Sequence, residues 1–210
     1  MAAVRVRQHV NPLSHKYRHT VEPPPWDALY ARPTQPLHLD IGCAKGHFLR
    51  QMAAQQPEWN FLGLEIREPL VDYALKLRDE ADQRNLHFVF CNANTSLKTI
   101  FQGGTPLPLQ QVSIQFPDPW FKKRHQKRRV VQPELVVQLA DLLPCGGRVV
   151  LQSDVEEVAQ EMCDRFAENA AFARTAAEWL PQSPFPAETE RERLTLDKGL
   201  PVYRAIFQRV

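Results

Sequence analysis

Short apolar runs alternate with longer amphipathic stretches along most of this chain. Such a short run that ends in turn residues, as at residues 37–41 before a glycine loop, is typical of a buried strand. The stretches between the runs repeat their apolar residues at helical spacing, as Leu70, Tyr73, Ala74 and Leu77 do. Strands are predicted at residues 37–41, 61–65, 86–91, 111–116 and 146–154, helices near 48–53, 70–81, 133–143 and 155–166, and further apolar segments at 172–180 and 202–210.

This alternation predicts a single α/β domain over residues 37–210. Strands that alternate with helices form a mostly parallel, doubly wound sheet with helices on both faces. Residues 1–36 differ in composition, because they are basic at first and then rich in proline. We expect them to form an arm that leads into the domain.

The distribution of charge is more informative than its sum. The net charge is only +2, yet the first twenty residues hold Arg5, Arg7, Lys16 and Arg18 and no acid. A second basic run, at residues 122–129, contains six lysines and arginines. Two basic patches on a nearly neutral protein indicate one face that binds a polyanion.

Other classes of protein fit the sequence poorly. The cysteines Cys43, Cys91, Cys145 and Cys163 are widely spaced, so no metal site is predicted and reduced, mostly buried thiols are expected. No apolar stretch approaches the ~20 residues that span a membrane, and the N-terminus lacks the apolar core of a signal peptide. The expected location is therefore the cytoplasm.

The first predicted strand runs into a glycine loop, DIGCAKG, at residues 40–46. In doubly wound sheets ligands bind beside this loop, at the carboxyl ends of the strands. Gly42 and Gly46 permit a tight turn and let a ligand approach the backbone. Glu65 closes the second strand, where an acid holds the ribose hydroxyls of a nucleoside. A nucleoside-containing cofactor is predicted, with a mere tight turn as the alternative.

Two features favour S-adenosylmethionine over a dinucleotide. The loop lacks the GxGxxG spacing of dinucleotide-binding proteins, which argues against an NAD-dependent oxidoreductase. Asp40 would repel a pyrophosphate but attracts the ammonium or sulfonium of S-adenosylmethionine. Asn92, at the end of the third strand, is a candidate for a hydrogen bond to the adenine edge, or else a plain loop residue.

The fourth predicted strand runs into FPDPWFKKRHQKRR, residues 116–129. Together with RVRQHVNPLS, LDIGCAKG, FLGLEIRE, QSDVEE and TERE, this segment resembles the tRNA (guanine-N7-)-methyltransferases of the TrmB type. The resembling segments span nearly the whole chain. The resemblance implies the seven-stranded, Rossmann-like sheet of S-adenosylmethionine-dependent methyltransferases. It also implies methyl transfer to N7 of the guanine at position 46, in the variable loop of tRNA.

The resemblance also assigns site residues by their position. It places Asp40, Glu65, Asn92 and Asp118 around the cofactor and makes Asp118 the catalytic residue. Two of the site positions depart from the family pattern, because Ala44 replaces a glycine and Asn92 stands where aspartate is frequent. Alanine is a mild change if φ is negative there, and asparagine keeps an acceptor oxygen.

For the substrate, Lys122, Asp154 and the segment from Thr189 to Glu192 match positions of the family that contact it. The cations Lys127, Arg128 and Arg129 of the same run are expected to bind tRNA phosphates, which position the nucleic acid without reading its sequence.

The chemistry of methyl transfer to guanine N7 explains why the single acid Asp118 precedes the basic run at residues 122–129. Guanine N7 has a free lone pair, so the reaction needs alignment rather than a base that removes a proton. During methyl transfer, positive charge leaves sulfur and develops on the purine. A carboxylate at Asp118 therefore stabilises the transition state more than it stabilises the neutral guanine. The same carboxylate can accept the guanine N1–H and amino protons.

Each assignment has a plainer alternative. The basic run can be a solvated helix face, Asp118 can cap the following turn, and Asp154 can be the N-cap of its helix. Thr189 and Glu192 can lie in a solvated loop. For the whole protein the alternatives are a ribosomal RNA methyltransferase and a non-catalytic RNA-binding protein. No obligatory protein partner is expected, and both a monomer and a homodimer agree with the sequence.

Overall fold

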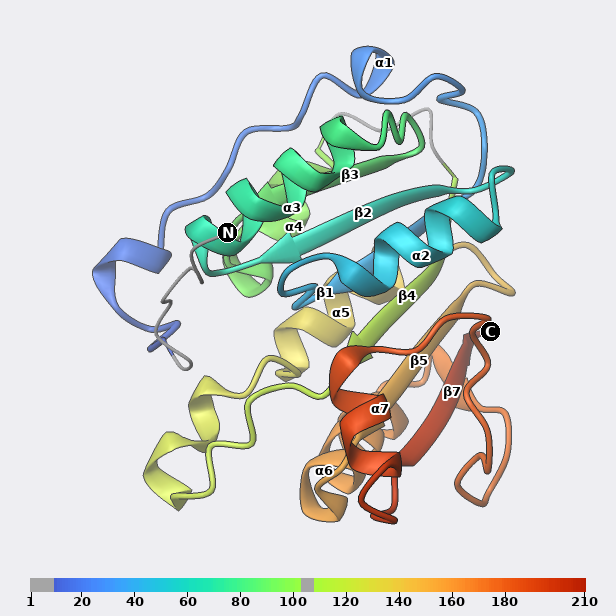
Figure 1. Cartoon of the computed structure of the whole chain (residues 1–210). Coiled ribbons are helices and arrows are strands. Elements are labelled where there is room, and N and C mark those ends of the chain that lie inside the picture. The colour runs from blue at the N-terminus through green and yellow to red at the C-terminus, as the bar shows by residue number, and fades with distance from the viewer. Residues whose placement is uncertain (1–9, 103–107) are drawn as a thin grey trace.

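The computed structural model describes residues 10–102 and 108–210, which form a seven-stranded sheet in the order β3-β2-β1-β4-β5-β7-β6 (Figure 1). The first five strands are parallel, whereas β7 is antiparallel to both of its neighbours. The strands are β1 (Leu37–Ile41), β2 (Asn60–Glu65), β3 (Leu86–Phe90), β4 (Leu109–Gln115), β5 (Arg148–Ser153), β6 (Phe172–Arg174) and β7 (Tyr203–Arg209). The predicted doubly wound, mostly parallel sheet is confirmed.

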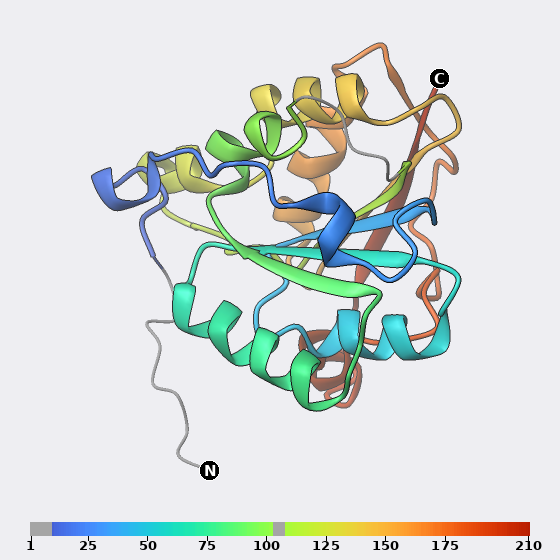
Figure 2. The same ribbon diagram turned by 90° about the horizontal axis from the view of Figure 1, so that it is seen from above.

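Helices cover both faces of this sheet. Figure 2 shows α4, α5 and α6 on one face and α2, α3 and α7 on the other. Each face has its own cluster of buried apolar side chains. The helices are α1 (Trp26–Leu29), α2 (His47–Gln55), α3 (Glu68–Glu80), α4 (Ala93–Ile100), α5 (Pro133–Leu142), α6 (Glu156–Ala167) and α7 (Glu190–Leu196), with short 3-10 helices η1 (His15–Tyr17) and η2 (Lys123–Arg128).

The sequence did not predict α7, which begins in the charged stretch ETERER at residues 188–193. Thr189 is its N-cap, and the Thr189 hydroxyl oxygen accepts a hydrogen bond from the backbone N–H of Glu192 at 3.0 Å. The spacing T-x-x-E, typical of a helix start, was the available signal. The alternative that Thr189 and Glu192 lie in a loop is therefore wrong.

The proline-rich part of the N-terminal segment packs against the domain. Trp26 and Tyr30 are buried in the same apolar cluster as β1, and the Tyr30 hydroxyl donates to the backbone oxygen of Phe61 at 3.1 Å. Two large aromatic side chains contribute enough apolar area to fix such a segment. The basic residues Arg5 and Arg7 lie outside the described residues.

The loop after β1 is left-handed at three positions, with φ of 88° at Gly42, 50° at Ala44 and 70° at Gly46. The backbone N–H of Ala44 donates to Oε2 of Glu65 at 2.9 Å, which fixes the turn. A side chain at Gly46 would also lie 2.4 Å from the ring of Phe88. The condition under which alanine is a mild change at residue 44 is not met, because its φ is positive.

Replacing Ala44 with glycine is expected to stabilise the fold by up to about 1 kcal/mol. Glycine removes the penalty that a Cβ carries at left-handed φ, and part of this gain is offset by the greater freedom of glycine in the unfolded chain. The melting temperature should rise by roughly 2–4 °C in thermal unfolding. Ala54→Gly, the same change within α2, is the control and should lower it. A lower melting temperature for Ala44→Gly would show that the loop is unstrained.

Candidate active site

A cavity opens at the carboxyl ends of β1, β2, β3 and β4. Its walls include Gly42, Glu65, Asn92 and Asp118, so the structure brings four of the predicted cofactor residues together. The cavity volume is about 140 Å³. Ligand pockets typically hold roughly 300–1,000 Å³. Side chains at the wall must therefore move to admit a nucleoside ligand, and Arg67 is among them.

Glu65 is 2% exposed, and both of its carboxylate oxygens are engaged. Oε1 accepts the Arg67 backbone N–H at 2.9 Å and its Nε–H at 2.8 Å. Oε2 accepts the Ala44 N–H at 2.9 Å and Nη2 of Arg67 at 3.0 Å. Because a carboxylate offers about four acceptor positions, none remains for a ribose while the guanidinium stays in place.

Asp40 lies behind the cavity wall and is 4% exposed. Its Oδ1 accepts Ser113 Oγ at 2.6 Å and Gln115 Nε2 at 3.3 Å. Burial, opposed by these two hydrogen bonds and reinforced by the charge of Glu65, raises the pKa of Asp40 to about 6. At neutral pH Asp40 is therefore ionised, and its hydrogen bonds come only from uncharged groups. A cationic group of a ligand next to it would be stabilised.

Asn92 has a different environment from the one expected. It is the N-cap of α4, and its Oδ1 accepts the Asn94 N–H at 3.2 Å. Its Nδ2 donates to the backbone oxygens of Pro12 at 3.2 Å and Tyr17 at 3.1 Å. The side chain therefore holds the N-terminal segment beside the cavity, which an aspartate has no donor to do.

The segment after β4 is strained on both sides of Asp118. Phe116 has φ of 48° and Trp120 has φ of 42°, values that bulky residues rarely adopt. Such strain persists only where the surroundings enforce it, and it concentrates at functional sites. The guanidinium of Arg128 stacks on Trp120, 4.9 Å from the ring centroid, and both residues line the cavity.

Arg129 anchors this segment and is 5% exposed. Its Nε donates to the backbone oxygen of Pro119 at 2.8 Å, its Nη2 donates to Glu157 at 2.9 Å, and it also pairs with Glu161. The expectation that Arg129 meets phosphates does not match this burial, because its donors are directed inward. Nothing in the sequence marks this distinction, since Arg129 is the last of the six cations in the run at residues 122–129.

The exposed cations of the run are Lys122, Lys123, Arg124 and Lys127. Most of the run forms η2, a 3-10 helix rather than the face of an α-helix. Only these four cations of the run are exposed, so the run does not present all of its charge to solvent.

Asp154 and Arg191 join the end of β5 to α7. Arg191 donates to Oδ2 of Asp154 through Nε at 2.8 Å, and the Asp154 side chain is 15% exposed. Helix α6 has Val155 as its N-cap, so the alternative that Asp154 caps this helix is wrong.

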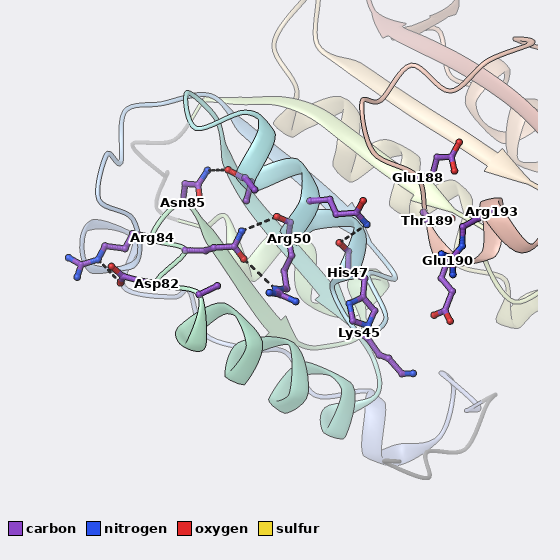
Figure 3. Close-up of a pocket in the computed structure, with 15 residues that line it drawn as sticks. Lys45, His47, Arg50, Asp82, Arg84, Asn85, Glu188, Thr189, Glu190 and Arg193 are labelled. Atoms are coloured by element: carbon purple, nitrogen blue, oxygen red, sulfur yellow. Dashed lines mark hydrogen bonds and ion pairs between the residues drawn. The ribbon is translucent and has the colours of Figure 1, made fainter. Parts of the chain in front are cut away.

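Glu192 is 1% exposed and forms an ion pair with Arg204 of β7, with Oε1 and Nη2 2.7 Å apart. Its side chain is directed inward, which does not match the substrate contact that the resemblance implies for it. Its neighbour Thr189 is partly exposed and lies at an open groove between α2 and the start of α7 (Figure 3). The groove has both charges in its lining, Lys45 and Arg193 as well as Glu188 and Glu190, and it shares no lining residue with the cavity.

Within residues 10–102 and 108–210, no group of three His, Cys, Asp or Glu side chains could hold a metal ion. The same residues contain no helix with the length and hydropathy to cross a membrane. All four cysteines are free, and three of them are buried, as predicted.

The residues around the loop fit S-adenosylmethionine. A Cβ at Gly42 would meet nothing within 4 Å, so the loop leaves open space for a ligand. Asp40 and Glu65 place two carboxylates beside this space, which suits a cationic nucleoside and disfavours a pyrophosphate.

Comparisons with known proteins agree with this site. The profile of a family described as "Putative methyltransferase" matches residues 34–205. The chain is 61% identical over 206 residues to a tRNA (guanine-N(7)-)-methyltransferase of Thermosynechococcus vestitus, covering 98% of this chain and 95% of the relative. It is 59% identical over 209 residues to the protein of the same name from Synechococcus elongatus, covering 100% and 98%.

Solved structures share the fold at low sequence identity. TrmN from Thermus thermophilus has a TM-score of 0.57 at 16% identity, covering 86% of this chain and 45% of that one. An rRNA methylase from Streptococcus thermophilus has a TM-score of 0.53 at 10% identity, covering 88% and 90%. The full-length relatives and the family profile, rather than these distant structures, determine the family. This chain belongs to the tRNA (guanine-N(7)-)-methyltransferase family.

Proposed function

We propose that this protein transfers a methyl group from S-adenosylmethionine to N7 of guanine in tRNA, at position 46 of the variable loop. The observation that carries the proposal is the strained segment that holds Asp118 in the cavity wall, a few residues before four exposed cations. The names and full-length similarity of the relatives support it. Because the substrate is tRNA, we place the reaction in the cytoplasm.

S-adenosylmethionine, when bound, supplies the methyl group on its sulfonium. We expect Glu65 to accept the ribose hydroxyls after the guanidinium of Arg67 has left its oxygens, which also enlarges the cavity. Asp40 stabilises the positive end of the ligand. Gly42 allows the ligand to lie against the backbone.

Asp118 acts on the guanine. Its carboxylate accepts the N1–H and amino protons of the base and stabilises the positive charge that develops on the purine. Arg129 supports this role from behind by holding the Pro119 carbonyl, so the motif stays fixed while RNA binds in front of it.

The tRNA phosphates are bound by the exposed cations Lys122, Lys123, Arg124 and Lys127. Arg128 is packed on Trp120 and lines the cavity instead. We expect Asp154 and Thr189 to border the RNA surface through the open side of α7.

The two alternative functions are a ribosomal RNA methyltransferase and a non-catalytic RNA-binding protein. The fit of the loop to a methyl donor argues against the second. Incubation with bulk tRNA and with ribosomal RNA, followed by mass mapping of modified nucleosides, should find N7-methylguanosine in the tRNA variable loop. Methylation of ribosomal RNA alone, or of neither, would overturn the proposed function.

Cofactor affinity should fall as the pH falls through about 6. Only the ionised form of Asp40 attracts the ammonium, and its pKa in the free protein is about 6. Above this pH binding has its full strength, and below it the dissociation constant rises by up to roughly tenfold per pH unit. Calorimetry with S-adenosylhomocysteine between pH 5 and 7.5 measures the effect. Asp40→Asn should bind weakly across the whole range, and a flat profile for the unaltered protein would contradict the ammonium contact.

The exposed cations should govern tRNA affinity and its salt dependence. The triple variant Lys123→Ala/Arg124→Ala/Lys127→Ala should bind tRNA more weakly, because each phosphate contact releases counterions. The slope of log K against log salt should become shallower by about 2–3 for three lost contacts. Filter binding at several salt concentrations measures it.

The matched control is Lys76→Ala/Lys98→Ala/Lys198→Ala, which removes the same charge outside the run. It should keep the slope of the unaltered protein. Equal slopes for the two triple variants would show that the basic run does not contact RNA.

Asp118→Asn should lower turnover by ~100-fold or more. The change keeps size and much of the hydrogen bonding but removes the charge that stabilises the purine cation. Dissociation constants for cofactor and tRNA should change much less, since other contacts hold both ligands. Single-turnover methyl transfer at saturating tRNA, with binding measured separately, tests this. Near-normal turnover for Asp118→Asn reduces the residue to positioning, and unchanged turnover for Asp118→Ala moves the catalytic centre elsewhere.

A further inference from the structure

We propose that Glu192 is a positioning residue for the cofactor, acting on Asp40 through the side-chain amides of Gln152 and Gln115. The four side chains form one hydrogen-bonded chain across α7, β5, β4 and β1. Glu192, Gln152 and Asp40 are buried, and Gln115 is partly buried at the cavity wall. The inference rests on the proposed function only through the contact of Asp40 with the cofactor.

The chain begins at a fixed charge. Glu192 accepts Arg204 Nε at 3.2 Å and Nη2 at 2.7 Å on its Oε1. Its backbone N–H is held by the Thr189 cap. Arginine can only donate and an ionised carboxylate can only accept, so the direction of these bonds is determined by chemistry.

The charge of Glu192 sets the orientation of the next amide. Gln152 is fully buried and donates through Nε2 to Glu192 Oε2 at 3.1 Å. Its own Oε1 has no hydrogen-bond partner among the described residues. A buried amide oxygen without a partner costs free energy, yet turning the amide over would place this oxygen against the Glu192 carboxylate. The orientation is therefore enforced by Glu192.

The same nitrogen of Gln152 donates to Gln115 Oε1 at 2.9 Å. Gln115 must then present its NH₂ on the other side, where it donates to Asp40 Oδ1 at 3.3 Å. A charge on α7 thus determines that a donor, and not a carbonyl oxygen, faces the acid beside the cofactor loop.

A second chain reaches the same oxygen from the other side. The ring of His38 is buried and its Nε2 lies 2.8 Å from Ser113 Oγ, which donates to Asp40 Oδ1 at 2.6 Å. Both chains satisfy Oδ1, which leaves the other oxygen of Asp40 for the ligand. The charged group that faces Asp40 from β2 is Glu65, and it opposes ionisation.

Glu192→Gln tests the proposal with little change of shape. The new amide keeps an oxygen for Arg204 and turns its NH₂ toward Gln152, which reverses both glutamines and directs a carbonyl oxygen at Asp40. The dissociation constant of S-adenosylhomocysteine, measured by calorimetry on the full chain without RNA, should rise about tenfold. The pH midpoint of binding should also shift upward, whereas KM for tRNA at saturating cofactor should stay the same.

Gln115→Leu cuts the chain and carries the test if Glu192→Gln does not fold. It should raise the dissociation constant of S-adenosylhomocysteine about tenfold. The melting temperature should stay close to that of the unaltered protein. The double variant Glu192→Gln/Gln115→Leu should bind as Gln115→Leu does, since Glu192 acts only through Gln115. Unchanged affinity in Gln115→Leu, or additive effects in the double variant, overturns the proposal.

The control for a merely structural role of α7 is Arg191→Ala, which breaks the other link of this helix to β5. Its cofactor affinity should equal that of the unaltered protein. A loss of cofactor affinity as large as that of Glu192→Gln would show that attachment of α7 to the sheet is all that cofactor binding requires. A raised KM for tRNA with normal cofactor affinity in Glu192→Gln would assign Glu192 to the RNA instead. If the unaltered protein binds cofactor but methylates no tRNA, the proposed function fails while this inference stands.

Discussion

The burial of three carboxylates at one edge of the sheet constrains the rest of this structure. Asp40, Glu65 and Glu192 are each 4% exposed or less, and a buried charge is tolerated only with compensating partners. Glu192 and Glu65 have arginines, whereas the hydrogen bonds to Asp40 come from neutral groups. The acid that lacks a cation in this set lies beside the open loop, so the remaining charge is matched when a cationic ligand binds there.

The same logic divides the basic run into two parts. Arg129 forms ion pairs with Glu157 and Glu161, and its Nε donates to the Pro119 carbonyl. It therefore fixes the segment that carries Asp118. Buried in this way, it cannot also neutralise a phosphate. Lys122, Lys123 and Lys127 of the same run are exposed to solvent. One run of like residues thus supplies both an internal anchor and an external surface.

The sequence predicted what depends on local pattern. The parallel strands, the glycine loop and the location of Asp118 follow from apolar periodicity and from motif position, and the structure has them where expected. The short helices α1 and α7 were not predicted. Partner choice across long sequence separations was not predictable. The pairing of Arg129 with α6, of Glu192 with Arg204 and of Asn92 with the N-terminal segment joins residues that no spacing rule relates. Whether φ at Ala44 is positive was likewise undetermined by composition alone.

The departure at Asn92 shows how the N-terminal segment and the cofactor cavity are connected. An amide at this position accepts from the start of α4 and donates to the backbone oxygens of Pro12 and Tyr17. An aspartate would present oxygens to those carbonyls and would repel them. Pro12 and Asn92 both line the cavity, so their hydrogen bond joins the N-terminal segment to one wall of it. At another wall, Arg67 is bound to Glu65. Cofactor entry therefore has to displace side chains rather than fill a preformed space, and the arm that leads toward the basic N-terminus is held by the same residue that borders the cofactor.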